Sequence, residues 1–287
     1  MTALQPKGHS RRLAQSPARS WRSGLDLWIP AAATAFIVIA CFVWPLLGDI
    51  PRSVDGNIAL ANLPAGSAGH LLGTDTVGND VLARVLAGGR VALEVGVATN
   101  VIGLIVGGSL GILAAAAGGA SDMLVARSLD ILIAFPAVVL ALLIAADLGP
   151  GELHVILALT FFTVPAYARL ARAHALQVRG LDFVQAARLS GARTSQTFGH
   201  LIPNVLPRLL TFSFLGVSLA ITFEASLSFL GLGVIPPAAS WGDMIAQGQE
   251  YLGTNPGLAL IPSACLVATV VSVNLTGDAV RTRLASR

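Results

Sequence analysis

The stretch VALEVGVATNVIGLIVGGSLGILAAAA, Val91–Ala117, decides the fold class of this chain. It is an apolar run in which Glu94 is the only charged residue. At 1.5 Å per residue a helix of this length extends about 40 Å, more than the roughly 30 Å hydrocarbon core of a bilayer. We therefore predict a transmembrane helix that tilts or protrudes from the membrane.

The whole chain shares this apolar character. It has 287 residues, of which 54% are apolar and 11% are charged, and its mean hydropathy is +0.75. A soluble domain carries about 25% charged residues, so lipid must be the solvent for most of this surface. The net charge of +3 comes from arginines that flank apolar runs, which favours anionic lipid head groups over nucleic acid as the partner.

Five further apolar runs predict transmembrane helices, which makes the expected fold all-α, a polytopic membrane protein with six transmembrane helices. The basic flank of the first run resembles a signal peptide, but the run is too long for one, so we expect an uncleaved anchor. We expect a kink at Pro136 in the third helix and a continuation of the fourth toward His174. The five runs are 28–48, 129–148, 153–167, 203–233 and 257–275.

These runs divide the chain into one membrane domain with polar flanks. The segment Gly78–Arg90 has an apolar helical stripe and predicts an amphipathic helix on the outer membrane surface. The expected parts are a disordered cytoplasmic tail at 1–27, the anchor at 28–48, an extracytoplasmic loop at 49–90, a core of five helices at 91–280 and a cytoplasmic tail at 281–287.

Basic residues indicate the orientation, because cytoplasmic loops are enriched in Lys and Arg. With the N-terminus inside, only Arg52, Arg84 and Arg90 of the 18 basic residues fall outside. We therefore expect both termini in the cytoplasm, with the protein in the cytoplasmic membrane and a large cytoplasmic loop between the fourth and fifth helices.

Several function classes find no support in the residues. The only lysine, Lys7, lies in the tail, so there is no phosphate-binding GxxxxGK[ST] loop. Cys41 and Cys265 lie in separate apolar runs and are interpreted as core residues. His70, Asp75 and Asp80 lack the tight spacing of a metal site, and no catalytic constellation is visible. We expect no cofactor in this chain and no enzymatic activity.

Two features within the spans are candidates for packing or transport. Gly103, Gly107 and Gly111 recur every four residues, a spacing that lets a neighbouring helix backbone approach closely. Glu224 is an intramembrane carboxyl, and such a group is costly and often functional. It either lines a solute pathway, braces a subunit interface, or makes a structural hydrogen bond to a neighbouring helix.

The predicted cytoplasmic loop reads GLDFVQAARLSGARTSQTFGHLIPNVLP, Gly180–Pro207. It predicts a short helix that Asp182 caps and Gly191 ends, then a second short helix that starts at Thr194 or Ser195. Ala186 and Ala187 leave one face smooth enough for a partner surface to approach closely.

This loop resembles the EAA loop of bacterial ABC importer permeases. The family pattern of Glu-Ala-Ala, three residues and Gly is matched by Gln185, Ala186, Ala187 and Gly191, with Gln185 in place of the acid. Pro203 falls one residue nearer to Gly191 than in the family pattern. The stretches His70–Arg90, Ser128–Pro136, Glu224–Met244 and NLTGDAVRTRL resemble the C-type subunit of dipeptide and oligopeptide (peptide/nickel) permeases, with Asn79 for the arginine of the GTDxxGRD motif.

The resemblance covers roughly 70–284 and implies a type I ABC importer fold, in which the loop is a coupling helix that docks on an ATPase. It implies four kinds of partner: a second homologous permease subunit, two cytoplasmic ATPase subunits or domains, an extracytoplasmic solute-binding protein and membrane lipid. The implied coupling residues are Asp182, Phe183, Gln185, Ala186, Ala187, Arg188, Gly191 and Ala192.

Short peptides are the solute that the resemblance implies. Import of nickel or another small solute by the same architecture stays open, because the binding protein holds most of the specificity. A channel or membrane scaffold without an ATPase is the alternative from another class. The loop argues against it, because a channel has no need for a cytoplasmic helix–glycine–helix unit.

Overall fold

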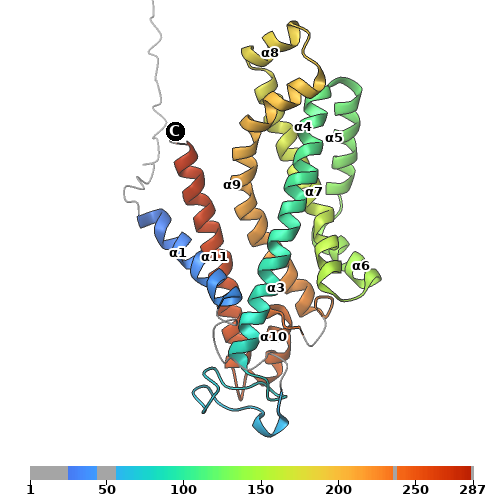
Figure 1. Ribbon diagram of the computed structural model, residues 1–287. Helices are drawn as coiled ribbons and strands as arrows, with labels where there is room; N and C mark the ends of the chain where they lie inside the picture. Colours follow the sequence, from blue (N-terminus) through green and yellow to red (C-terminus); the bar gives the residue numbers. More distant parts are fainter. Residues whose placement is uncertain (1–24, 44–55, 235–237, 286–287) are drawn as a thin grey trace, which may run out of the picture.

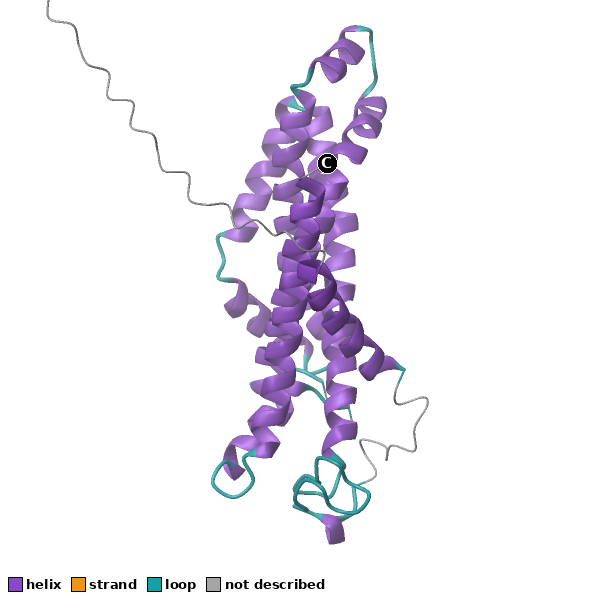
Figure 2. Ribbon diagram, turned by 90° about the vertical axis from the view of Figure 1, so that its left-hand side faces the viewer, coloured by secondary structure: helices purple, strands orange, loops and turns teal. Residues whose placement is uncertain are grey.

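The computed structural model describes residues 25–43, 56–234 and 238–285, and in these ranges the chain forms an elongated bundle of helices (Figures 1 and 2). The helix order is α1 Leu25–Phe42, η1 Ile58–Leu60, α3 Val81–Ile102, η2 Gly103–Gly107, α4 Gly108–Ala117, α5 Gly119–Ile133, α6 Ala137–Leu148, α7 Glu152–Arg179, α8 Asp182–Leu189, α9 Thr194–Phe229, α10 Trp241–Gly248, η3 Gln249–Tyr251 and α11 Gly257–Ala285. The expected tail at 1–27 and the end of the expected anchor lie mostly outside the described residues.

Four helical stretches in the described ranges are long and apolar enough to cross a membrane, and they comprise α3 to α4, α7, α9 and most of α11. The prediction of an all-α membrane fold is therefore confirmed. The number of transmembrane helices, six, stays a prediction. The first expected span is described only as the shorter helix α1, and the third is divided into two shorter helices.

The second span begins earlier than expected. Its helix starts at Val81, passes through Arg90 without a break and continues through the π-helical turn η2 to Ala117. The predicted separate surface helix at Gly78–Arg90 is therefore wrong. Its apolar residues Val81 and Val85 are buried in a cluster that includes Trp241, which joins them to the bundle.

The third span is broken where a kink was expected. Pro136 separates α5 from α6 and has an extended ψ of 118° at the start of α6. A proline lacks the N–H that would continue the hydrogen-bond ladder, so the chain reorients here. Helix α5 also begins ten residues before the predicted span, at Gly119, directly after the turn at Gly118, where φ is +69°.

The fifth span absorbs the second helix of the loop. Helix α9 runs from Thr194 to Phe229 with Pro203 and Pro207 inside it, so the expected start after Pro203 is wrong. Leu201, Val205 and Leu209 lie fully buried on one face of this segment and hold it against α7 and α4. This packing outweighs the loss of backbone hydrogen bonds at the two prolines. Helix α11 likewise continues past Leu275 to Ala285, so the expected tail begins inside a helix.

The three glycines of α3 to α4 lie against α7. A Cβ atom on Gly103 would come within 2.8 Å of the Tyr167 ring. A Cβ atom on Gly107 or Gly111 would overlap the carbonyl oxygen of Val164 or Ala168. The two backbones therefore approach so closely that only glycine fits at these positions.

Candidate functional site

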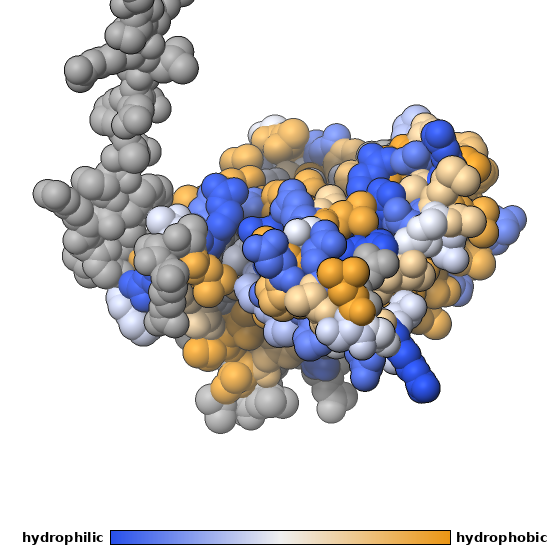
Figure 3. All heavy atoms as spheres, turned by 90° about the horizontal axis from the view of Figure 1, so that it is seen from above, coloured by the Kyte–Doolittle hydropathy of each residue, from blue (hydrophilic) through white to orange (hydrophobic). Residues whose placement is uncertain are grey.

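The loop expected to couple to a partner projects from one end of the bundle. Helix α8 lies at this end, at the top of Figure 1, and the C-terminal end of α11 lies toward the same end. The loop at 56–80 and helix α10 lie at the opposite end. Viewed from the α8 end, hydrophilic residues cover much of the surface, with hydrophobic ones interspersed (Figure 3).

A Schellman turn fixes the angle between α8 and α9. Gly191 has φ +86°, in the left-handed region, and the N–H of Ala192 donates to the carbonyl of Ala187 at 3.0 Å. This pairing is the 6→1 bond of the motif, and glycine is the residue that adopts its conformation without strain. The side chain of Gln196 then accepts from the N–H of Arg193 at 2.7 Å, which caps the start of α9.

Among the described side chains of residues 181–189, one is fully buried and three large apolar ones are exposed. Val184 is fully buried in the cluster that includes Leu201 and Val205 of α9. Leu181, which precedes the helix, is 48% exposed, Phe183 is 50% exposed and Leu189 is 89% exposed. The single inward contact anchors the helix, and its outward face presents apolar side chains that have no cover within the described chain.

The remaining coupling residues lie on this same hairpin. Gln185 and Ala186 are exposed and Ala187 is half-buried, while the side chain of Arg188 lies outside the described residues. Asp182 was expected to cap the helix but is its first residue, so the cap position belongs to Leu181. Its carboxylate still lies at the positive end of the helix dipole.

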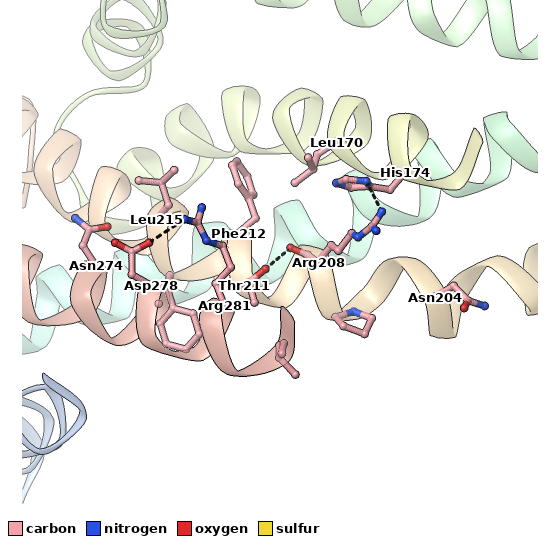
Figure 4. Close-up of a pocket in the computed structure, with 14 residues that line it drawn as sticks. Leu170, His174, Asn204, Arg208, Thr211, Phe212, Leu215, Asn274, Asp278 and Arg281 are labelled. Carbon is pink, nitrogen blue, oxygen red and sulfur yellow. Dashed lines mark hydrogen bonds and ion pairs between the residues drawn. The ribbon is translucent and has the colours of Figure 1, made fainter. Parts of the chain in front are cut away.

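A groove of about 820 Å³ opens beside this end of the bundle (Figure 4). Helices α7, α9 and α11 line it, and their contributions mix aromatic, aliphatic and charged side chains. The lining residues include His174 of α7, Arg208 and Phe212 of α9, and Asp278 and Arg281 of α11. No sequence motif indicates that these five residues meet, because they lie on three helices far apart in the chain.

Glu224 lies outside this groove. Its side chain is 1% exposed, and its Oε1 atom accepts hydrogen bonds from Ser228 at 2.7 Å and from Ser240 at 2.8 Å. Its Oε2 atom has no hydrogen-bond partner among the described residues. Because Ser240 is the N-cap of α10, the carboxyl joins α9 to α10. This contact fits the third role considered for Glu224, a structural hydrogen bond to a neighbouring helix.

The motif GTDTVGND folds the loop at the opposite end. Asp75 accepts from the backbone N–H of Asn79 at 2.8 Å and forms an ion pair with Arg84. Thr74 accepts from the N–H of Leu63 at 2.9 Å, and Asp80 caps α3 by accepting from Ala83 at 2.8 Å. These residues therefore bind the loop to the start of α3, a role that sequence spacing alone did not reveal.

The three residues considered as metal ligands, His70, Asp75 and Asp80, form contacts within this same loop. His70 and Asp80 pair directly at 2.8 Å, while Asp75 is engaged by Arg84 and Asn79. No group of three or more His, Cys, Asp or Glu side chains able to hold a metal occurs in the described ranges. Cys41 and Cys265 are free thiols that both pack in the cluster around Trp241.

The apolar helices define a multi-pass membrane protein, and a helix–glycine–helix hairpin projects from one end of its bundle. Residues 107–287 match the model of the family described as binding-protein-dependent transport system inner membrane component. The chain belongs to this family of ABC transport permeases.

Curated relatives extend the similarity over most of the chain. A glutathione transport system permease protein of Pectobacterium atrosepticum is 34% identical over 92% of this chain and 89% of its own. A putative peptide transport system permease protein of Brucella suis is 39% identical over 95% of this chain and 88% of its own. A di/tripeptide transport system permease protein of Pseudomonas aeruginosa is 39% identical over 77% of this chain and 74% of its own.

Proposed function

We propose that this chain is one of two permease subunits of an ATP-driven importer of short peptides. The relatives are named as permeases for peptides, di/tripeptides and glutathione, which supports a short peptide as the solute. An extracytoplasmic binding protein delivers the peptide, and the path runs between this chain and its partner permease. The distribution of basic residues supports a cytoplasmic location for both termini and for α8.

One observation carries the coupling role: α8 exposes Phe183 and Leu189 at the end of the bundle while Val184 anchors it. An ATPase subunit that receives these apolar side chains moves α8 when it binds and hydrolyses ATP. Because α9 follows the turn as one continuous helix, this movement reaches the membrane directly. The hydrolytic chemistry resides in the ATPase, since this chain has no phosphate-binding loop.

The proposal is tested by two substitutions in the hairpin. Ala186→Trp adds bulk to the exposed face, and Gly191→Val forces a β-branched residue into the left-handed region, at a cost of about 1–3 kcal/mol. Each is expected to lower ATPase co-purification and peptide uptake at least tenfold, with normal accumulation of the chain in the membrane for Ala186→Trp.

Gly253→Val is the matched control, because Gly253 lies at the opposite end of the bundle and a Cβ atom there meets no neighbour within 4 Å. It should leave co-purification and uptake unchanged. Survival of both activities in the two hairpin variants would show that the docking role is wrong.

A further inference from the structure

The groove between α7, α9 and α11 contains an arginine, Arg208, that forms no ion pair with any described residue. Arg208 lies on α9 and lines the groove, and its Nη1 atom donates to Nδ1 of His174 at 2.9 Å and to Oε1 of Gln177 at 3.2 Å (Figure 4). No carboxylate in the described parts of the chain lies within ion-pair distance of its guanidinium.

Neither of these two partners of Arg208 carries a negative charge. Nδ1 of His174 also lies 3.4 Å from Oε1 of Gln177, so the three side chains form one polar cluster. Gln177 follows His174 by three residues on α7, and the two side chains hold Arg208 from one side. Only Nη1 donates in these two bonds, so the positive charge stays available to a ligand in the groove.

The second arginine of the groove differs in this respect. Arg281 and Asp278 lie one turn apart on α11 with 3.9 Å between their charged atoms. Their opposite charges offset each other, whereas no further acidic residue among the described lining of the groove offsets the charge of Arg208. The lining therefore carries one unbalanced positive charge, and it belongs to α9.

We propose that Arg208 binds the terminal carboxylate of the peptide as it passes through the groove, an inference that rests on the proposed function. The planar guanidinium matches a carboxylate with two parallel hydrogen bonds, and every linear peptide with a free C-terminus carries one such group. The volume of about 820 Å³ is typical of sites that hold a small organic ligand. Phe212 and Leu215, which line the same groove, provide apolar contacts for varied side chains.

The site lies on the helix that the coupling hairpin moves. Arg208 is on α9, while His174 and Gln177 are on α7, so a shift of α9 relative to α7 changes the position of the guanidinium. His174 and Gln177 are positioning residues, and Arg208 is the group that touches the peptide.

The test measures binding without the solute-binding protein, which has its own preference for peptides. The complex of permeases and ATPases is placed, without nucleotide, in nanodiscs of phosphatidylcholine. Saturation-transfer NMR then gives dissociation constants for alanyl-alanyl-phenylalanine and for its C-terminal amide. We expect the wild type to bind the acid about tenfold more tightly than the amide, the scale of one charge-assisted contact.

Substitutions assign this preference to one residue. Arg208→Gln should reduce it to about twofold or less, and Arg208→Lys should retain part of it, because the charge stays and the planar fork is lost. Arg281→Gln is the matched control, since it removes a positive charge from the same groove, and it should keep the wild-type preference.

Three results would overturn the inference: an equal preference in wild type and Arg208→Gln, no preference in the wild type, or no measurable binding of either peptide. Loss of co-purified phosphatidylglycerol from Arg208→Gln, with no change in peptide preference, would assign the guanidinium to lipid phosphate instead. Binding-protein-dependent uptake of the same tripeptide is measured beside these assays. Its absence would reject the proposed function, whereas uptake without a carboxylate preference rejects this inference alone.

Discussion

At the scale of single residues, the end of the bundle opposite α8 contains a buried ion pair. Arg84 is 8% exposed and Asp75 is 6% exposed, and the two form an ion pair beside Asp243. Burial raises the pKa of the Asp75 carboxyl. Hydrogen bonds from Asn79 and Arg84 together lower this pKa by more than burial raises it, so the net pKa lies below the ordinary value. The folded state therefore binds a proton at Asp75 less readily than the unfolded chain does.

This shift predicts a pH-dependent contribution to stability. A depressed carboxyl pKa stabilises the fold fully above the ordinary value of about 4 and loses this contribution as pH falls below it. We expect Asp75→Asn to lower the free energy of unfolding by about 3 kcal/mol at pH 7, because it leaves Arg84 with the more distant Asp243. The difference from wild type, followed by thermal unfolding in detergent, should shrink as pH falls from 4 toward 3.

The exposed pair of Arg169 and Asp130 provides the control. The side chains of Arg169 and Asp130 are 54% and 50% exposed, so Asp130→Asn should change the free energy of unfolding by less than about 1 kcal/mol at any pH. A deficit of Asp75→Asn that stays constant down to pH 3 would contradict a role for the ionised carboxylate.

At the scale of elements, the carboxyl of Glu224 is one of several contacts that join α10 to its neighbours. Oε1 of Glu224 accepts from two hydroxyls, and Gly242 of α10 lies so close to Ala225 that an added Cβ atom would overlap its carbonyl. Nε1 of Trp241 also donates to the carbonyl of Val85 at 2.9 Å. Helix α10 is thereby fastened to both α9 and α3.

Substitution of Glu224 separates a bracing role from a pathway role. Glu224→Gln keeps an acceptor oxygen for Ser228 and Ser240, so it should retain stability and uptake, whereas Glu224→Ala leaves both hydroxyls without an acceptor and should cost about 1–3 kcal/mol. Thermal unfolding and peptide uptake measure the two effects. Normal stability with abolished uptake in Glu224→Gln would instead indicate that the carboxyl acts on the solute.

At the scale of the whole molecule, the two ends of the bundle face different compartments in the proposed topology. Ile58, in the loop at one end, is 80% exposed, and Leu189, on α8 at the other, is 89% exposed. A membrane-impermeant maleimide should label Ile58→Cys in intact cells and Leu189→Cys only after the membrane is permeabilised. Labelling of Leu189→Cys in intact cells would place α8 outside, where no ATPase is available to drive it.

The two native cysteines differ in exposure, so their own labelling is measured as well. Cys41 is 4% exposed, whereas Cys265 is half-buried. The unsubstituted chain, treated in the same way, supplies the background for both variants.

The sequence was most informative where local chemistry decides the outcome. The apolar run from Val91 predicts a spanning helix because lipid leaves a backbone no other partner than itself. Gly191 predicts the turn after α8 because its positive φ suits glycine, and the family follows from the motif that surrounds it. Gly103 and its two counterparts pointed to close helix packing by their spacing, though not to α7 as the helix they meet.

The sequence was least informative where distant segments meet. Pro203 signalled a helix start, but α9 passes through it because Leu201 and Val205 are buried against neighbouring helices. Val81 suggested a helix on the membrane surface, but it is buried in the cluster that includes Trp241 and Met244 of α10.

The amino-acid sequence by itself determined the all-helical membrane class, the turn at Gly191 and the family, since each depends on residues near one another in the chain. Only the tertiary structure decided that Arg208 meets His174 and Gln177 beside α11, and that Glu224 fastens α10. Such contacts join helices far apart in sequence, and they form only when side-chain packing has fixed how those helices cross.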